Sequence, residues 1–253
     1  MAKKYIKTSA MLSMLNQVHL GGIINEAVVG IKKGKATIEA VDITASIVFI
    51  SKSSVGHKKL SCELGLGNIE LFKRFLQTAK DPKLDIKLTE NRMIISRKDK
   101  RRRLEYLLSQ PALIPTQLSM DDDDEDAREK FINSIDCRAN IDEDFVKDFC
   151  SYINTLKTKI VTINTKDSNV TFKLGPKSEH QFALMLELNE EADDEINIFV
   201  NGEYLAKILS VIEFSQDEDA EPITIGFGDD APVTIESEES LWAISPSEET
   251  EED

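Results

Sequence analysis

Apolar positions along this chain follow two different periods. Most segments alternate apolar and polar residues, as short β-strands do, whereas four segments space apolar residues three and four positions apart, as amphipathic helices do. The predicted order is strand, helix, four strands, helix and three strands, and it occurs twice. The first copy has strands near 3–7, 24–31, 36–41, 46–52, 58–64, 84–89, 92–97 and 102–108 and helices near 9–19 and 68–79. The second has strands near 132–140, 159–165, 169–174, 180–188, 195–200, 222–227, 232–237 and 240–244 and helices near 142–154 and 202–213.

The second helix of each copy fixes the register between them. NIELFKRFL at 68–76 aligns with NGEYLAKIL at 201–209, and in both the apolar residues form one stripe that we expect to pack on a sheet. The aligned polar pairs are Asn68 with Asn201, Glu70 with Glu203, and Arg74 with Lys207. The predicted apolar stripe of the helix at 68–79 is Ile69, Phe72, Leu76 and Ala79. The helix at 9–19 has Met11, Leu15 and Val18, and the helix at 142–154 has Phe145, Phe149 and either Tyr152 or Ile153.

The segment between the copies, QPALIPTQLSMDDDDEDAREKF, has prolines that interrupt pairing and an acidic run that opposes collapse. It is either a plain tether or a functional loop. We therefore expect a first domain at 1–109, an acidic linker at 110–131, a second domain at 132–246 and an acidic tail at 247–253.

Composition narrows the class of protein. A chain of 253 residues with 41% apolar residues can bury a core, and no apolar run reaches the roughly 18–20 residues of a membrane span, so we expect no membrane partner. The three cysteines are widely spaced and form no CxxC pair, which is typical of a reducing compartment. The three histidines are isolated, so we predict no metal site and no cofactor.

Charge divides the chain into two unlike halves. Residues 1–110 hold 21 Lys and Arg against 10 Asp and Glu, a net charge of +11, whereas residues 111–253 hold 10 against 36, a net charge of −26. Much of the negative charge lies in runs that are typical of solvated loops and ends. A surface that attracts phosphate is therefore compatible with the overall charge of −15.

Three local motifs accompany the duplicated order of elements. ATIEAVDITASIVFI at 36–50 has a strand ending in Ala40, Val41 and Asp42; LDIKLTENRMIISRKDKRRRLEYLL at 84–108 reads as three adjoining strands; and GDDAPVTIES at 228–237 precedes a last strand that ends in Ser245–Pro246 and an acidic tail. This arrangement resembles the DNA sliding clamps of the proliferating cell nuclear antigen type, including their archaeal and phage counterparts. The resemblance covers essentially the whole chain.

The resemblance implies an α+β DNA clamp fold of two duplicated domains, each with antiparallel sheets outside and two helices on the inner face of a ring. It implies no enzymatic activity and no catalytic residues. Three identical chains would supply the six domains of the family's ring, which would encircle double-stranded DNA and tether a DNA polymerase to it. A clamp loader is implied as a further partner. Cationic side chains near the helices would then meet phosphates without reading bases. The predicted DNA-facing residues are Lys73, Arg74, Lys80, Lys83, Lys147, Lys157 and Lys207.

The basic run RKDKRRR at 97–103 reads either as a nucleic-acid patch or as a turn whose charge keeps a hairpin soluble. In the family, the strand after it pairs with a strand of a neighbouring chain's second copy, here near 180–188. A basic first copy would then meet an acidic second copy head to tail. The predicted subunit-interface residues are Arg101, Arg102, Arg103, Tyr106, Leu108, Phe182, Leu184 and Leu186.

Partner proteins of this family insert a short peptide into an apolar pocket near the linker and the C-terminal segment. We expect alternation on the last strand to place either Trp242 and Ile244 or Leu241 and Ala243 on a surface groove. The predicted pocket residues are Val41, Ala45, Ser46, Leu118, Pro232, Ala243, Ser245 and Pro246, with Leu113 as an alternative from the linker.

Two other interpretations remain open from the sequence. One is an α+β enzyme, although the chain has no P-loop, GxSxG, HExxH or paired Cys and His motif. The other is an acidic scaffold, or a checkpoint-type clamp subunit that assembles with unlike chains. A clamp is expected inside the cell with DNA: in the cytoplasm of a prokaryotic host for a phage or archaeal protein, and in the nucleus for a eukaryotic one.

Overall fold

The chain forms two compact units, unit 1 at residues 1–119 and unit 2 at residues 120–253. The computed structural model describes residues 4–79, 81–97, 103–116, 126–175, 180–191, 195–217, 219–229 and 231–247. The boundary between the units falls within the segment 110–131 that separates the two sequence copies.

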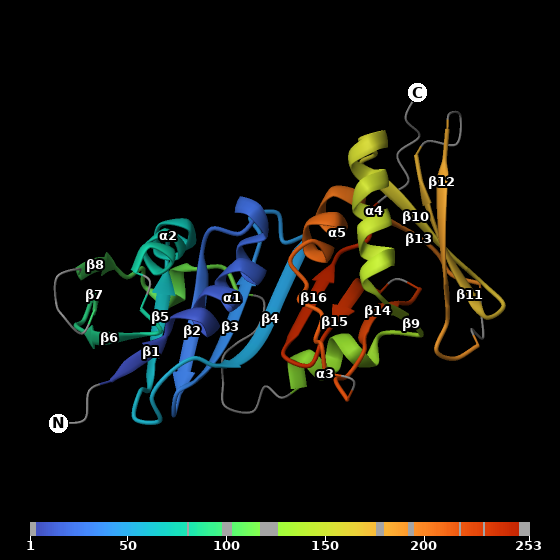
Figure 1. The fold of residues 1–253 in the computed structure, drawn as a ribbon. Coiled ribbons are helices and arrows are strands. Elements are labelled where there is room, and N and C mark those ends of the chain that lie inside the picture. The colour runs from blue at the N-terminus through green and yellow to red at the C-terminus, as the bar shows by residue number, and fades with distance from the viewer. Residues whose placement is uncertain are drawn as a thin grey trace. The chain divides into compact units, whose positions relative to one another are not determined.

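Unit 1 contains two α-helices and eight strands, in the order of the first sequence copy. The helices α1 (Thr8–His19) and α2 (Ile69–Ala79) pack against each other, as Figure 1 shows. The strands are β1 (Tyr5–Lys7), β2 (Ala27–Lys32), β3 (Lys35–Val41), β4 (Ile47–Ser54), β5 (Cys62–Leu66), β6 (Lys83–Leu88), β7 (Arg92–Ser96) and β8 (Arg103–Leu107). Short 3₁₀ turns follow α1 at Leu20–Gly22, where Gly21 and Gly22 take positive φ angles, and β8 at Pro111–Leu113.

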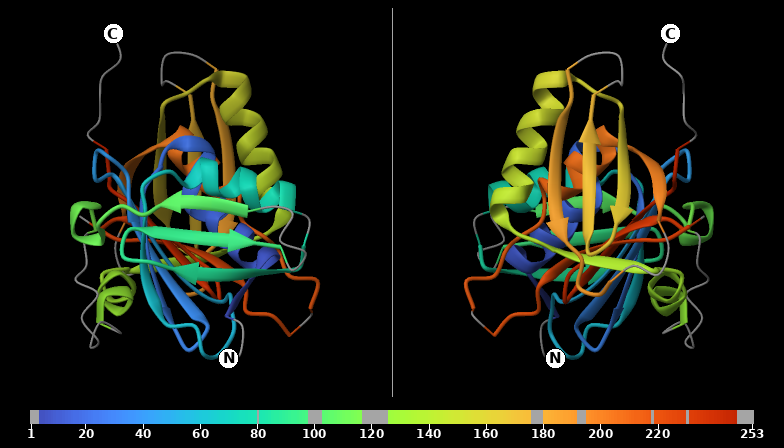
Figure 2. Two further views of the ribbon diagram at one scale, coloured as in Figure 1. Left: turned by 90° about the vertical axis from the view of Figure 1, so that its left-hand side faces the viewer. Right: turned by 90° about the vertical axis from the view of Figure 1, so that its right-hand side faces the viewer.

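Two antiparallel sheets make up unit 1. One has the strand order β1-β6-β7-β8, and the other runs β5-β2-β3-β4. Alternate residues of the strands meet the apolar stripes of both helices in the core, and the predicted stripes are confirmed because Met11, Leu15, Val18, Phe72 and Leu76 are all buried. The left view of Figure 2 faces β6, β7 and β8, and β8 has a strand on one side only in its sheet.

Unit 2 repeats this plan with one addition. Its helices α4 (Glu143–Leu156) and α5 (Gly202–Leu209) also pack against each other. Its strands are β9 (Cys137–Ile141), β10 (Ile160–Lys166), β11 (Asn169–Leu174), β12 (Phe182–Glu187), β13 (Asn197–Asn201), β14 (Ile223–Phe227), β15 (Val233–Glu236) and β16 (Ser240–Ile244). The addition is helix α3 (Asp126–Asn133), which precedes β9.

The sheets of unit 2 are antiparallel as well. One has the order β12-β11-β10-β13 and is seen in the right view of Figure 2, and the other contains β16, β15, β14 and β9 in that order. Aromatic rings fill the core between α4 and β11, where Phe145 lies 5.1 Å from Phe172 between ring centroids. Ile153 of α4 is buried and Tyr152 is only half-buried, which decides between the two residues that the sequence left open.

Three predicted elements have a wrong boundary, and one of them is the strand expected near 58–64, which begins only at Cys62. The strand expected near 132–140 begins only at Cys137, because its first residues belong to α3, which also occupies the end of the predicted linker. The helix expected near 202–213 ends at Leu209. The backbone N–H of the C-cap residue Ser210 donates to the carbonyl of Ala206.

Candidate functional site

The exposed face of α2 carries charged side chains that are linked to one another and to α1. Glu70 accepts a hydrogen bond at 2.7 Å from Nε of Arg74, one turn later, and its other oxygen lies 3.7 Å from Nζ of Lys73. Nζ of Lys73 also lies 3.1 Å from Nδ1 of His19, the last residue of α1. The cluster of His19, Glu70, Lys73 and Arg74 thus joins α1 to α2.

The two predicted DNA-facing residues of this cluster differ in exposure. The side chain of Arg74 is 72% exposed, whereas that of Lys73 is 12% exposed because it lies over α1 against His19. Arg74 is therefore accessible to a ligand, although its Nε is paired with Glu70. Lys73 must first leave His19 and Glu70.

The surroundings of the cluster shift two of its pKa values. Burial lowers the pKa of His19 from its usual value, and the ammonium of Lys73 lowers it further, against an opposite effect of Glu70. Neutral His19 can therefore accept at Nδ1 from Lys73. The hydrogen bond from Arg74 lowers the pKa of Glu70, so this carboxylate stays ionised.

The helices α4 and α5 of unit 2 carry one Lys each. Lys207 of α5 pairs with Glu203 at 2.9 Å, four residues earlier, which is the spacing of Arg74 and Glu70 in α2. Lys147 and Lys157 are exposed, at the middle of α4 and at its C-cap. α4 begins with the N-cap Asp142, whose carboxylate accepts from the N–H of Phe145 at 2.7 Å.

Lys83, another predicted DNA-facing residue, lies away from the helix faces. It is exposed at the start of β6, with its ammonium 4.9 Å from the centroid of the Tyr5 ring. Lys80 lies outside the described residues.

The edge strand β8 presents two faces. Arg103 is exposed and pairs with Glu105, Leu107 is 67% exposed, and Leu108 is half-buried. Tyr106 is a correction to the predicted interface, because its side chain is buried and points into unit 1. Its hydroxyl donates to the carbonyl of Asn68 and accepts from the N–H of the same residue, both at 2.8 Å. Arg101 and Arg102 lie outside the described residues.

The edge strand β12 of unit 2 carries apolar side chains with little cover. The ring of Phe182 is 37% exposed and stacks on Tyr152 of α4, with centroids 4.1 Å apart. Leu184 and Leu186 are half-buried, and Met185 is 63% exposed. Like β8, this strand has a neighbour on one side only in its sheet. Both strands predicted for the subunit interface are therefore edge strands within their units.

The predicted pocket residues of unit 1 lie at the turn from β3 to β4. The carboxylate of buried Asp42 accepts hydrogen bonds from the N–H groups of Thr44, at 3.1 Å, and Ile47, at 2.6 Å. Val41 is buried, Ser46 is half-buried, and Ala45 is exposed with a positive φ. Ile43, between them in the turn, is 97% exposed.

The predicted pocket residues of unit 2 lie on β16 and nearby. Pro232 is half-buried, and Ser245 and Pro246 are exposed. Ala243 is a correction, because every residue of β16 is buried and neither alternating set of side chains lines an open groove. Leu118 lies outside the described residues, and Leu113 is 75% exposed in its 3₁₀ turn. Since the predicted set is divided between the units, a single pocket formed by it stays a prediction.

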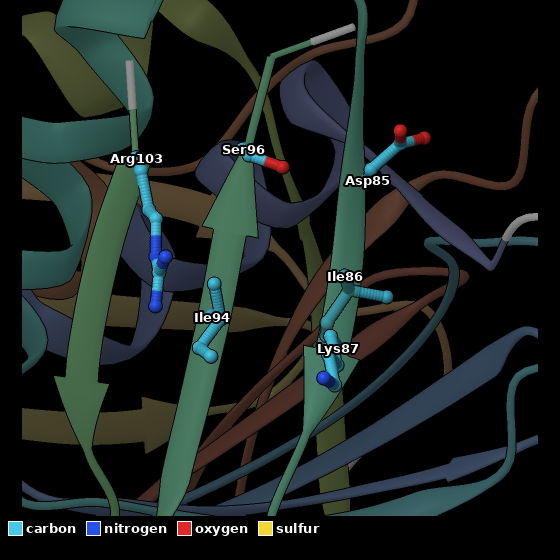
Figure 3. A pocket seen from close by; sticks show the side chains of 6 residues that line it. All are labelled: Asp85, Ile86, Lys87, Ile94, Ser96 and Arg103. Carbon is cyan, nitrogen blue, oxygen red and sulfur yellow. The ribbon is translucent and has the colours of Figure 1, made fainter. Parts of the chain in front are cut away.

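A shallow pocket of about 400 Å³ lies on β6, β7 and β8. Figure 3 shows Ile94 on the middle strand β7, between Arg103 of β8 and Lys87 of β6. Its remaining lining residues are Asp85, Ile86 and Ser96. This lining contains neither a histidine nor a cysteine that could pair with Ser96 for nucleophilic catalysis.

Other chemistry is sparse in the described part of the chain. It contains no group of three or more His, Cys, Asp or Glu side chains placed to hold a metal ion. None of the helices in the described ranges is long and apolar enough to cross a membrane. Burial raises the pKa of Cys62 to about 11, so this thiol is a poor nucleophile at neutral pH.

Sequence reasoning missed three residues that shape these surfaces. His19 was set aside as isolated because its partners Glu70 and Lys73 are more than 50 residues away in the chain. Leu107 and Met185 were not among the predicted interface residues, although they alternate with the predicted residues Leu108, Leu184 and Leu186. The alternation itself was the available signal, because side chains on one face of a strand recur at every second position.

Comparisons with known proteins find a match for the structure but not for the sequence. No protein-family model matches the sequence, and no curated protein matches it. The structure is similar to the crystal structure of proliferating cellular nuclear antigen from Entamoeba histolytica, with a TM-score of 0.69 over 97% of this chain and 98% of that chain, at 11% sequence identity. The predicted α+β clamp fold is thereby confirmed.

Proposed function

We propose that the protein is a sliding clamp, one chain of a ring that encircles double-stranded DNA and tethers a DNA polymerase. The observation that carries this proposal is the likeness of fold to proliferating cellular nuclear antigen over almost the full length of both chains. Such a protein acts by topology and by holding partners. It needs no catalytic residues.

The helix faces support a role next to DNA. Each unit has two packed helices whose outward faces are polar, and cations such as Arg74, Lys147 and Lys207 are long enough to reach phosphates. Contacts of this kind carry no sequence information, which suits a protein that moves along the duplex. Lys73, Lys83 and Lys157 would add to them, together with Lys80.

The edge strands support assembly of three identical chains. β8 belongs to the basic unit 1 and β12 to the acidic unit 2, and each leaves backbone groups and apolar side chains without a neighbour on one side within its unit. Pairing β8 of one chain with β12 of the next would join unlike charges and bury Leu107 and Met185. The contact is heterologous, so it closes a ring only at a fixed number of chains.

Further partners follow from the same proposal. A ring must be opened for loading, so a clamp loader is expected, and the exposed residues Ile43, Leu113 and Pro246 are candidates for contacts with partner peptides. An archaeal or phage source and a site of action with DNA inside the cell belong to this proposal too.

The mass of the purified protein in solution tests the assembly. A clamp of identical chains should have three times the chain mass of 28.4 kDa at micromolar concentration. A monomer that associates only after unlike chains are added would favour a heteromeric clamp. A monomer that never associates and never binds duplex DNA would contradict the proposal.

A further inference from the structure

The cations on the proposed DNA face stand beside carboxylates in a repeated pattern. Arg74 follows Glu70 by four residues and pairs with it, and Lys207 follows Glu203 by four residues and pairs with it in the other unit. In α4, Lys147 follows Glu143 by four residues and Asp144 by three. The pattern thus occurs on three helices and at corresponding positions of the two sequence copies.

The charges of these faces are nearly balanced as a result. Within the bounds of α1, α2, α4 and α5 there are five carboxylates and four Lys or Arg, a net charge of −1. α1 contributes no Asp, Glu, Lys or Arg at all. A surface that served only to attract phosphate would not need carboxylates within contact distance of its cations.

We propose that Glu70 and Glu203 are internal counter-charges that compete with DNA phosphate for Arg74, Lys73 and Lys207. Their effect is to keep the hold of the clamp on duplex DNA weak. This inference rests on the proposed function, because it assumes that these helix faces meet DNA.

The geometry of the pairs suits competition better than permanent neutralisation. Glu70 is 38% exposed and Glu203 is 65% exposed, so water screens both pairs and a phosphate can displace either carboxylate. Exposed pairs of this kind contribute little net stability. Because the carboxylate must leave the cation before phosphate can bind, each pair lowers the affinity for DNA by a small factor. The same reduction would occur in every chain of a ring.

Lys73 is even less available to phosphate than Arg74 and Lys207. It is held by Glu70 and by Nδ1 of His19, and only 12% of its side chain is exposed. Removing the charge of Glu70 releases Arg74 entirely and leaves Lys73 with one partner. We therefore expect α2 to gain more from loss of its carboxylate than α5.

The test is duplex binding by five forms of the full-length protein, which include the unchanged chain and a chain that lacks only the three cations. The substitutions Glu70→Gln and Glu203→Gln are made together, first in the native chain and then in a chain that also carries Lys73→Ala, Arg74→Ala and Lys207→Ala. The charge-matched control carries Glu63→Gln and Glu239→Gln, which remove one exposed carboxylate from β5 and one from the turn before β16. Affinity for a linear 30-base-pair duplex is measured by fluorescence anisotropy over a series of salt concentrations.

The expected result is a gain that depends on the cations. The Glu70→Gln and Glu203→Gln protein should bind about two- to five-fold more tightly per pair released, with a steeper salt dependence. The same substitutions should give no gain in the alanine background, and the control should change affinity by less than the paired variant. A merely structural role for the pairs would shift the thermal midpoint without changing affinity.

Each other outcome is informative. An equal gain in the alanine background, or from the control, would mean that the carboxylates act by long-range repulsion, and the inference would fail. Unchanged binding after loss of the two glutamates, with weaker binding after loss of the three cations, would overturn the inference and leave the proposed function standing. Unchanged binding after loss of the three cations would remove the DNA-facing role and the inference together.

Discussion

Units 1 and 2 share one plan of strands and helices but carry opposite charge. Unit 1 has a net charge of +11 and unit 2 a net charge of −26, although both place two packed helices against two antiparallel sheets. Sheets and stripes depend on where apolar residues recur, and surface charge is free to diverge. In the proposed ring, this divergence would favour contact between unlike units of neighbouring chains over contact between like ones.

The second helices show the same division between what is shared and what differs. Asn68 caps α2 by accepting from the N–H of Leu71 at 2.8 Å, and Asn201 caps α5 by accepting from the N–H of Tyr204 at 3.1 Å. The links to other elements differ. α2 is held by Tyr106 of β8 and His19 of α1, whereas in α5 the carbonyl of Ala206 accepts from Sγ of Cys150 in α4 at 3.5 Å. The capping residue is therefore the same in both copies, and the tertiary links are not.

The largest expected effect is loss of chain assembly on substitution of a residue in either edge strand. If the proposed ring forms, Met185→Lys in β12 or Leu107→Lys in β8 should each abolish the trimer, because either change replaces an exposed apolar side chain of the proposed contact with a charge. Sedimentation at micromolar concentration measures the mass. Ile43→Lys is the matched control, since Ile43 is more exposed than either residue but lies in a turn. A trimer that survives both edge substitutions would exclude the proposed pairing of β8 with β12.

A smaller effect is expected from the link between β8 and α2. Tyr106→Phe leaves the N–H and carbonyl of Asn68 without their partner in a part-buried position, so the free energy of unfolding should fall by about 1–3 kcal/mol. Urea denaturation followed by circular dichroism measures it. Tyr204→Phe in α5 is the control, because the described residues offer its hydroxyl no hydrogen bond. Equal losses of unfolding free energy in the two variants would mean that the two hydrogen bonds of the Tyr106 hydroxyl contribute nothing specific to unit 1.

The helix caps should behave alike in the two units. Asn68→Ala and Asn201→Ala each remove one side-chain acceptor at a helix start, so each should lower stability by about 1 kcal/mol. The same urea experiment compares them. A loss at one position only would show that the two copies no longer share this cap.

The smallest effect is a pH dependence confined to unit 1. Because the pKa of His19 lies below its usual value in the folded protein, the unfolded chain takes up this proton first as the pH falls. Stability is therefore expected to fall as the pH drops through about 6.5 towards the lowered pKa. His19→Gln should flatten the thermal midpoint between pH 7 and pH 5, relative to His180→Gln. The reverse slope, with stability rising on acidification because of His19, would contradict the lowered pKa.

The sequence predicted the fold well because the fold depends on apolar periods. The stripe of Ile69, Phe72, Leu76 and Ala79 needs only the spacing of the helix, and all four residues are buried. Helix α3 was missed because an acidic run precedes it and few apolar residues mark its face. Its C-terminal end also makes a tertiary contact that the sequence pattern does not show, because Arg138 donates to the carbonyl of Ile132 at 2.9 Å.

The candidate site was predicted less well, because it depends on tertiary position. Lys73 and Arg74 are neighbours on a polar face, yet one is covered by α1 and the other is exposed. Tyr106 and Leu107 are adjacent on an edge strand, and only the structure shows which of them points into unit 1. Periodicity places such residues on a face but does not say what lies opposite that face.

The central claim is that the protein holds DNA by encircling it, and a topological measurement tests it most directly. The protein is incubated with a linear duplex whose ends are open, both ends are then blocked with streptavidin, and the complex is washed in about 1 M salt, where exposed charges are screened within about 3 Å. A closed ring should stay on the blocked duplex through the wash and leave an unblocked one by sliding off, and the Leu107→Lys protein should be lost from both. Loss of the unchanged protein from blocked and open duplexes alike would contradict the account, because the binding would then be electrostatic contact alone.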